Sequence, residues 1–169
     1  MRKEATIALL LGIAACSTEP HGAAQPSVEP PPSPSAPDDV APPEAMSTLA
    51  GRLRWEAEHR PGAALAAEEV LTALAAAGLS IDPPRQYLGL TARARYCSGG
   101  TTAGGLAVAV CEYGSADEAA AARTYVIETF AAMNANREIH VRGATTLTLS
   151  GSGRLGDDAR RAAAVFANL

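Results

Sequence analysis

Lysine and aromatic residues are scarce in this sequence. Its only lysine is Lys3, and phenylalanine, tryptophan and tyrosine together make up 4% of the chain. A Walker-type phosphate loop and a Schiff-base enzyme each need a lysine in the folded part, so the sequence argues against both classes. With so few aromatic side chains, we expect the hydrophobic core to consist of leucine, valine, isoleucine and much alanine.

An excess of positive charge is missing as well. Residues 17–45 contain five acids and no lysine or arginine, whereas residues 46–169 contain twelve arginines and twelve acids. The second segment is therefore formally neutral. Because nucleic-acid-binding domains carry a general basic surface, we expect no nucleic acid partner.

The apolar run at the N-terminus is short. It covers Ala5–Ala15, and eleven residues of helix reach about 17 Å, roughly half of a hydrocarbon core, so a membrane-spanning helix is not expected. Arg2 and Lys3 precede the run. A charged start followed by a short apolar stretch is typical of an export signal.

The run ends in Leu11-Gly12-Ile13-Ala14-Ala15-Cys16, a branched apolar residue, two small residues and a cysteine. This pattern resembles the lipobox of bacterial lipoproteins. The resemblance covers residues 1–16 and implies that residues 1–15 are a removable signal peptide and that the Cys16 thiol receives diacylglycerol. It also implies a membrane anchor, and Ser17 fits retention at the outer membrane, facing the periplasm. An ordinary secretory signal with an incidental cysteine is the alternative.

Residues 16–45 are predicted to hold the lipidated cysteine and a disordered, proline-rich linker. Nine of the twelve prolines lie between residues 17 and 45, and that stretch has no apolar periodicity. At about 3.1 Å per residue, it reaches roughly 90 Å. We interpret it as a spacer; the P-x-x-P spacing of Pro31, Pro34 and Pro37 leaves docking to an aromatic groove as the alternative.

Residues 46–169 are predicted to form one small domain. Apolar periodicity predicts helices over residues 47–59 and 65–78, and Gly78 is expected to form a left-handed cap at the end of the second. Ser115 and Glu118 have the spacing of a capping box, which predicts a third helix from Ser115 to about Asn134, and a fourth is predicted from Asp157 onward. Alternation predicts strands over residues 88–97 and 106–113, and two short ones around Ile139 and Leu147 joined near Gly143. The grouped order favours an α+β two-layer sandwich, with a mostly antiparallel four-stranded sheet and helices on one face. A ferredoxin-like relative is one topology that fits, and the strand order stays open.

Cys97 and Cys111 are predicted to face each other across the hairpin. If they pair, residues whose numbers sum to 208 are opposite each other, and residues 103–105 are left as a tight loop. In an oxidising envelope this predicts a structural disulfide, worth about 3 kcal/mol in the chain-entropy model. Free thiols, or a metal or redox role, are the alternatives.

One sheet face is expected to carry polar side chains and to stay free of helices. Arginine and tyrosine are common binding anchors, so this face is predicted to meet an anionic ligand, a glycan or a partner protein in the envelope. A merely solvated face is the alternative. The anchors on this predicted face are Arg93, Arg95, Tyr113, His140 and Arg142, accompanied by Thr91, Glu138, Thr146 and Thr148.

No set of residues forms a convincing catalytic, cofactor or metal site. Residues 151–156 read G-x-G-x-x-G, but too few residues follow for a dinucleotide fold, so a turn is the simpler interpretation. Glu56 and His59 have ligand spacing on a helix, yet a di-iron site needs a second such pair. We therefore expect a non-enzymatic envelope lipoprotein that binds or positions another component. A periplasmic hydrolase or transferase with a dispersed active site is the alternative.

Overall fold

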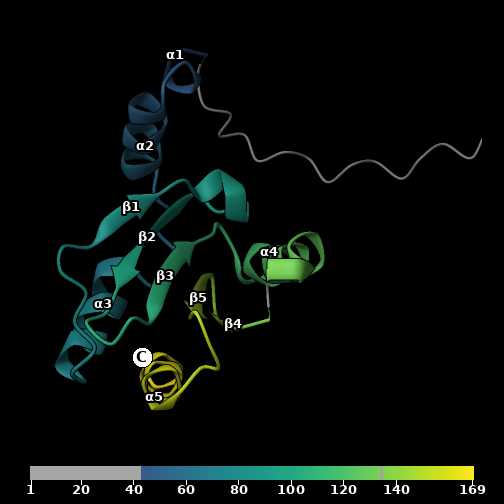
Figure 1. Cartoon of the computed structure of the whole chain (residues 1–169). Helices are drawn as coiled ribbons and strands as arrows, with labels where there is room; N and C mark the ends of the chain where they lie inside the picture. Colours follow the sequence, from purple (N-terminus) through teal and green to yellow (C-terminus); the bar gives the residue numbers. More distant parts are fainter. Residues whose placement is uncertain (1–42, 134) are drawn as a thin grey trace, which may run out of the picture. The chain divides into compact units, whose positions relative to one another are not determined.

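A computed structural model describes residues 43–133 and 135–169 of the chain (Figure 1). The predicted signal peptide, the lipidated Cys16 and the linker up to residue 42 lie outside the described residues. Residues 43–45, which the sequence assigns to the linker, belong to a helical turn, α1 (Pro43–Met46). Helical structure therefore begins before the predicted domain boundary at residue 46.

The strands form one five-stranded sheet in the order β1-β2-β3-β5-β4, and all neighbouring strands are antiparallel. The predicted α+β class is confirmed, but the predicted count of four strands is wrong. The additional strand is β1, which has only three residues and directly follows the Pro83-Pro84 turn, so it is too short to show alternation. The bounds are β1 (Arg85–Tyr87), β2 (Tyr96–Thr101), β3 (Ala107–Glu112), β4 (Arg137–Arg142) and β5 (Thr145–Ser150).

The order of elements along the chain differs from a ferredoxin-like fold. After the first helices the chain runs β1, β2, β3, α4, β4, β5, α5, whereas a ferredoxin-like chain runs β-α-β-β-α-β. That suggested topology is therefore wrong. Strand β5 lies between β3 and β4, so α4 (Ala116–Thr129) connects two strands that are parallel to each other but not adjacent.

The hairpin of β2 and β3 has the predicted register. Cys97 pairs with Cys111 and Thr101 with Ala107, so paired residue numbers sum to 208. The connecting loop contains Gly105 at a φ of +83°, a conformation that favours glycine. The second predicted hairpin is also present: Gly143, at a φ of +53°, lies in the turn between β4 and β5.

The expected strand over residues 88–95 is not formed. This segment instead contains the 3₁₀ helix η1 (Gly89–Ala92), followed by Arg93 in a left-handed conformation, with a φ of +54°. Gly89 packs so closely on the backbone of Ala94 that an added Cβ would lie 2.5 Å from its carbonyl oxygen. The alternation of leucine and alanine in this stretch therefore resembled a strand without producing one.

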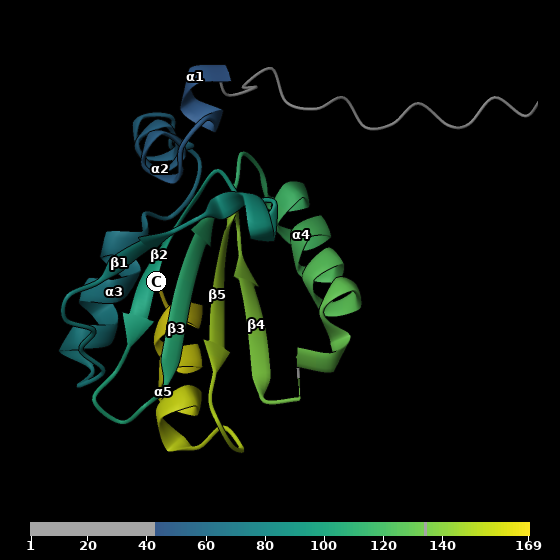
Figure 2. The same cartoon turned by 45° about the horizontal axis from the view of Figure 1, so that its top comes forward.

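Helices lie on both faces of the sheet, so the prediction of helices on one face only is wrong. Helices α3 and α5 contact each other and cover one face, whereas α4 packs against β4 and β5 from the other. Figures 1 and 2 show α4 beside β4, apart from α3 and α5. The remaining helices are α2 (Leu49–Glu58), α3 (Ala67–Ala76), the 3₁₀ helix η2 (Ala131–Met133) and α5 (Asp157–Ala167).

Two hydrophobic clusters correspond to these two faces. The larger cluster lies under α3 and α5 and consists largely of aliphatic side chains, as the composition predicted. The smaller one contains the disulfide, Tyr113 and two alanines of α4, Ala119 and Ala122. The face under α4 is therefore covered by few and small side chains, and this difference creates the candidate site.

Candidate functional site

The sheet face under α4 is hollowed between that helix and residues 87–92. The hollow, which we call the sheet groove, has a volume of about 420 Å³. Helix α4 contributes one wall, and the segment that contains η1 contributes the opposite wall. The floor comes from three central strands: Cys97, Ala107, Ala109, Cys111, Thr146 and Thr148.

The groove exists because small side chains form its floor. On β3, Ala107 and Ala109 face the groove and are half-buried, whereas Val108 and Val110 face the main core and are buried. Along β3, small side chains therefore alternate with large ones, whereas in most half-exposed strands polar side chains alternate with apolar ones. Helix α4 buries only its first two inward alanines, so the floor under its second half stays open.

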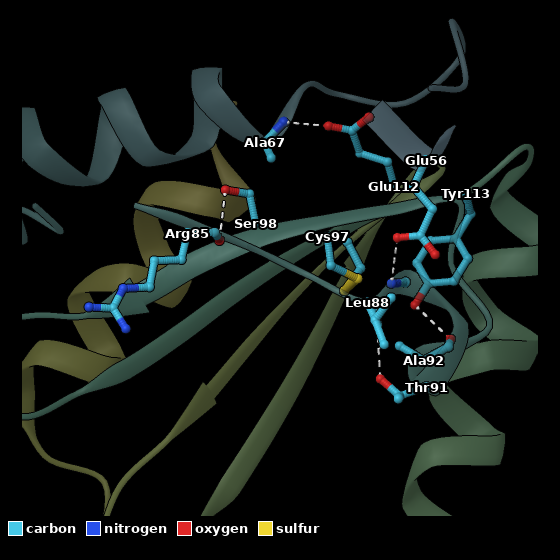
Figure 3. The surroundings of a disulfide bond; sticks show 12 residues. Glu56, Ala67, Arg85, Leu88, Thr91, Ala92, Cys97, Ser98, Glu112 and Tyr113 are labelled. Carbon is cyan, nitrogen blue, oxygen red and sulfur yellow. Dashed lines mark hydrogen bonds between the residues drawn. A yellow bond between two sulfur atoms is a disulfide. The ribbon is translucent and has the colours of Figure 1, made fainter. Parts of the chain in front are cut away.

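The Cys97–Cys111 disulfide is present in the floor of the groove, as predicted. The two sulfur atoms are 2.06 Å apart, and Cys97 and Cys111 are 2% and 5% exposed. Figure 3 shows Leu88 and the ring of Tyr113 beside the disulfide. By closing a loop of 14 residues, the bond stabilises the hairpin by about 3 kcal/mol in the chain-entropy model.

The charged side chains that line the groove are all positive. Arg123 and Arg137 belong to its lining, and, of the residues that the structure describes, no carboxylate or histidine does. The Arg123 Nε atom donates a hydrogen bond of 3.1 Å to the carbonyl oxygen of Ile139, which holds this guanidinium at the β4 side. Arg137 begins β4 and lies opposite Ser150. The cationic end of the groove is therefore the end at β4.

Three residues of the predicted binding face hold the groove together. Tyr113 is 2% exposed and donates a hydrogen bond of 3.3 Å to the carbonyl oxygen of Ala92 in η1, and burial raises its pKa (Figure 3). The Arg93 guanidinium lies over the Tyr125 ring of α4, 3.6 Å from its centre. Arg95 lies 3.9 Å from a carboxylate oxygen of Glu118. These contacts join residues 89–95 to α4.

His140 and Arg142 lie on the opposite face, so the prediction that all five anchors share one surface is wrong. The register of β4 pairs His140 with Leu147 and Arg142 with Thr145, on the side of α3 and α5. The Arg142 Nη1 atom donates a hydrogen bond of 2.7 Å to Ala167 at the end of α5. The Nε2 atom of His140 lies 3.2 Å from Oε2 of Glu138. Thr146 and Thr148 lie on the groove face, and Thr91, which belongs to η1, also lines the groove.

A buried ion-pair cluster was not identified from the sequence. The carboxylate of Glu112, 1% exposed, accepts hydrogen bonds from the amide of Ala67 (2.7 Å) and from Arg60 Nε (3.0 Å). Arg60 also pairs with Glu68, and its guanidinium lies 4.1 Å from the centre of the Tyr96 ring. Arg60 and Glu112 are 52 residues apart, so no local pattern links them.

Glu56 is a second buried carboxylate that the sequence did not reveal. It is fully buried and accepts hydrogen bonds from the amide of Gly89 (2.9 Å) and from Arg52 Nε (2.8 Å). It therefore connects α2 to the η1 wall of the groove. His59, one helical turn after Glu56, has its Nδ1 atom 2.8 Å from the carbonyl oxygen of Trp55.

The remaining motifs do not come together as a site. Residues 151–156 form the turn between β5 and α5. Within residues 43–133 and 135–169, no three histidine, cysteine or acidic side chains are grouped to hold a metal ion. None of the helices in the same residues is long and apolar enough to cross a membrane.

The sheet groove is thus the candidate site, built by residues 87–92, α4 and the strands between them. Its lining combines apolar side chains with two arginines. The signal that sequence reasoning missed was the alternation of alanine with valine along β3. No family model, curated protein or solved structure matches this chain, so the function has to be argued from this geometry.

Proposed function

We propose that this protein is an envelope lipoprotein, anchored in a membrane through Cys16, whose folded domain binds a ligand in the sheet groove. The observation that carries the proposal is the groove itself. Its volume of about 420 Å³ falls in the range of about 300 to 1,000 Å³ that is usual for ligand sites. Its apolar walls and few polar groups are also typical of such sites.

Features of the sequence support the proposed location. The lipobox-like residues before Cys16 support lipidation and export, and the proline-rich linker supports a domain held away from the membrane surface. The Cys97–Cys111 disulfide fits an oxidising compartment outside the cytoplasm. The predicted partners, an envelope protein or an anionic ligand, become in this proposal the occupant of the groove.

Filling the groove tests the proposal. Ala109→Phe places a large ring over the half-buried floor of β3, where the side chain faces the hollow. We expect the full chain with Cys16→Ser, which lacks the thiol for the lipid anchor, to bind the neutral apolar dye Nile red. Ala109→Phe should weaken that binding about tenfold or more, a loss of at least about 1.4 kcal/mol.

The matched control is Ala121→Phe, which adds the same ring at an exposed position of α4. Fluorescence titration of the three proteins, with circular dichroism to verify folding, gives the comparison. Dye binding that is equal in both phenylalanine variants and in the parent chain would show that the groove is not the binding site.

A further inference from the structure

The sheet groove is uncharged at one side and cationic at the other. Its wall of residues 87–92 is lined by Tyr87, Leu88, Thr91 and Ala92, and its β4 side by Arg123 and Arg137. Tyr87 ends the edge strand β1 and Arg137 begins the edge strand β4, so the lining reaches both edges of the sheet. The charge of the lining therefore changes from one side of the sheet to the other.

Polar groups of the floor are found at the same end as the arginines. Thr148 pairs with Ile139 and Ser150 with Arg137, so both hydroxyl-bearing residues belong to the β4 side of the floor. Toward β1 the floor consists of alanine and the disulfide. An occupant with a polar head at β4 and an apolar body toward β1 would match both halves.

The sign of the charge selects an anionic head. Glu138, the carboxylate next to Arg137 in the chain, pairs with Leu149 on the other face, where it lies 3.2 Å from His140. Glu138 is not part of the groove lining, but it lines an adjoining hollow that Arg123 and Arg137 also border. An anion at Arg123 and Arg137 would gain charge-assisted hydrogen bonds, which are stronger than neutral ones.

The backbone of the floor favours a hydrocarbon chain over a peptide. Strands β2, β3 and β5 each pair with a strand on both sides, so their ladder groups are already bonded. Peptides that bind to sheets usually add to an unpaired edge. An acyl chain needs no hydrogen-bond partner and can lie across the strands on small side chains.

We propose that the sheet groove binds a long-chain fatty acid, with its carboxylate at Arg123 and Arg137 and its acyl chain over Ala109 toward Leu88. This inference rests on the proposed function, because it names the ligand class of the same groove. It adds two requirements that the proposed function does not make: a negative charge and a single long chain.

Displacement of Nile red from the full chain with Cys16→Ser tests these requirements. Palmitate should displace the dye, and hexadecanol, which has the same chain without the charge, should compete about tenfold less well. Acetate, which has the charge without the chain, should not compete. This comparison uses unaltered groove residues, so it does not depend on the folding of a variant.

The arginines are tested by Arg123→Gln combined with Arg137→Gln. We expect the double variant to bind palmitate about tenfold more weakly while its affinity for hexadecanol stays the same. Replacement of the exposed Arg154 by glutamine is the matched control and should change neither affinity. Circular dichroism verifies that the variants are folded.

The outcomes separate the two proposals. If the dye binds in an Ala109-dependent way but palmitate competes no better than hexadecanol, the groove binds ligands and the fatty-acid inference is wrong. The fatty-acid inference is also wrong if palmitate binding is unchanged in the double arginine variant. If no dye or lipid binding depends on Ala109, both proposals fail.

Discussion

Arg60 connects three parts of the fold. Its guanidinium bonds to Glu112 at the end of β3 and to Glu68 in α3, and it lies over the Tyr96 ring of β2. Glu112 in turn accepts a hydrogen bond from the amide of Ala67, at the start of α3. A single side chain thus neutralises a buried carboxylate and holds the first turn of α3 on the sheet.

Replacing Arg60 with methionine should lower the free energy of unfolding by about 3 kcal/mol. The reason is that Glu112, whose side chain is 2% exposed, would stay buried without its cationic partner. Urea denaturation with the disulfide intact measures the loss. Arg154→Met at an exposed position is the control, and equal stability of the two variants would contradict this role of Arg60.

Arg60→Met should also change how the free energy of unfolding depends on pH in the acidic range. The hydrogen bond from Arg60 holds the pKa of Glu68 below its usual value of 4.5. A carboxyl group with a lowered pKa in the folded state contributes stability above its unfolded pKa and loses it as the pH falls through the folded value. The parent chain should therefore lose stability below about pH 4.5, and Arg60→Met should lose less over the same range.

Among the elements, α4 has the most local support at its start. The amide of Glu118 donates a hydrogen bond of 3.1 Å to the hydroxyl oxygen of Ser115, and the Glu118 carboxylate accepts one of 2.9 Å from the amide of Gly114. These two hydrogen bonds form the predicted capping box. In the usual box the glutamate accepts from the amide of the cap residue itself, whereas here it accepts from the amide of Gly114. Because α4 is a wall of the sheet groove, the cap also fixes the site.

Ser115→Ala should reduce the free energy of unfolding by about 1 kcal/mol, since it leaves the Glu118 amide without its cap. Chemical denaturation measures the change, and hydrogen exchange at the Glu118 amide should become faster. Ser152→Ala, in the exposed turn before α5, is the matched control and should leave both unchanged. An unaltered exchange rate at Glu118 would mean that the cap does not protect the helix.

Capping signals and the hairpin register were predicted well, whereas the alternation over residues 88–95 was not a strand. The left-handed cap at Gly78, with a φ of +82°, the capping box at Ser115 and the pairing of Cys97 with Cys111 each lie within one helix or one hairpin and are confirmed. Each depends on local geometry that the side chains themselves impose.

Placement of elements on the sheet was less predictable. On the edge strand β4, Ile139 and Val141 were expected on the same sheet face as Leu147 and Leu149. The register instead pairs them with Thr148 and Thr146, which puts them on the groove face. An edge strand is only partly covered, so burying its apolar residues does not determine which face they take. The groove could not be predicted either, because its walls depend on contacts between distant residues, such as Glu56 with Gly89.

At the scale of the whole molecule, Cys16 and the disulfide cysteines should have separate roles. Cys16→Ser should abolish palmitate labelling and move the protein from the membrane to the soluble fraction, because the acylated thiol is lost. Labelling and fractionation of cells that express each variant measure this. The double variant Cys97→Ser with Cys111→Ser should keep its label, and labelling that persists in Cys16→Ser would refute the anchor.

The two outer strands of the sheet bear on self-association. β1 has only three residues, and four of the six residues of β4 are arginine, glutamate or histidine. A long apolar edge strand can pair with a strand of another molecule and so extend the sheet from one molecule to the next. Short or charged edge strands prevent this pairing. Copies crowded together on a shared membrane, as the proposed anchor would place them, would therefore find little in the described part of the domain on which to polymerise.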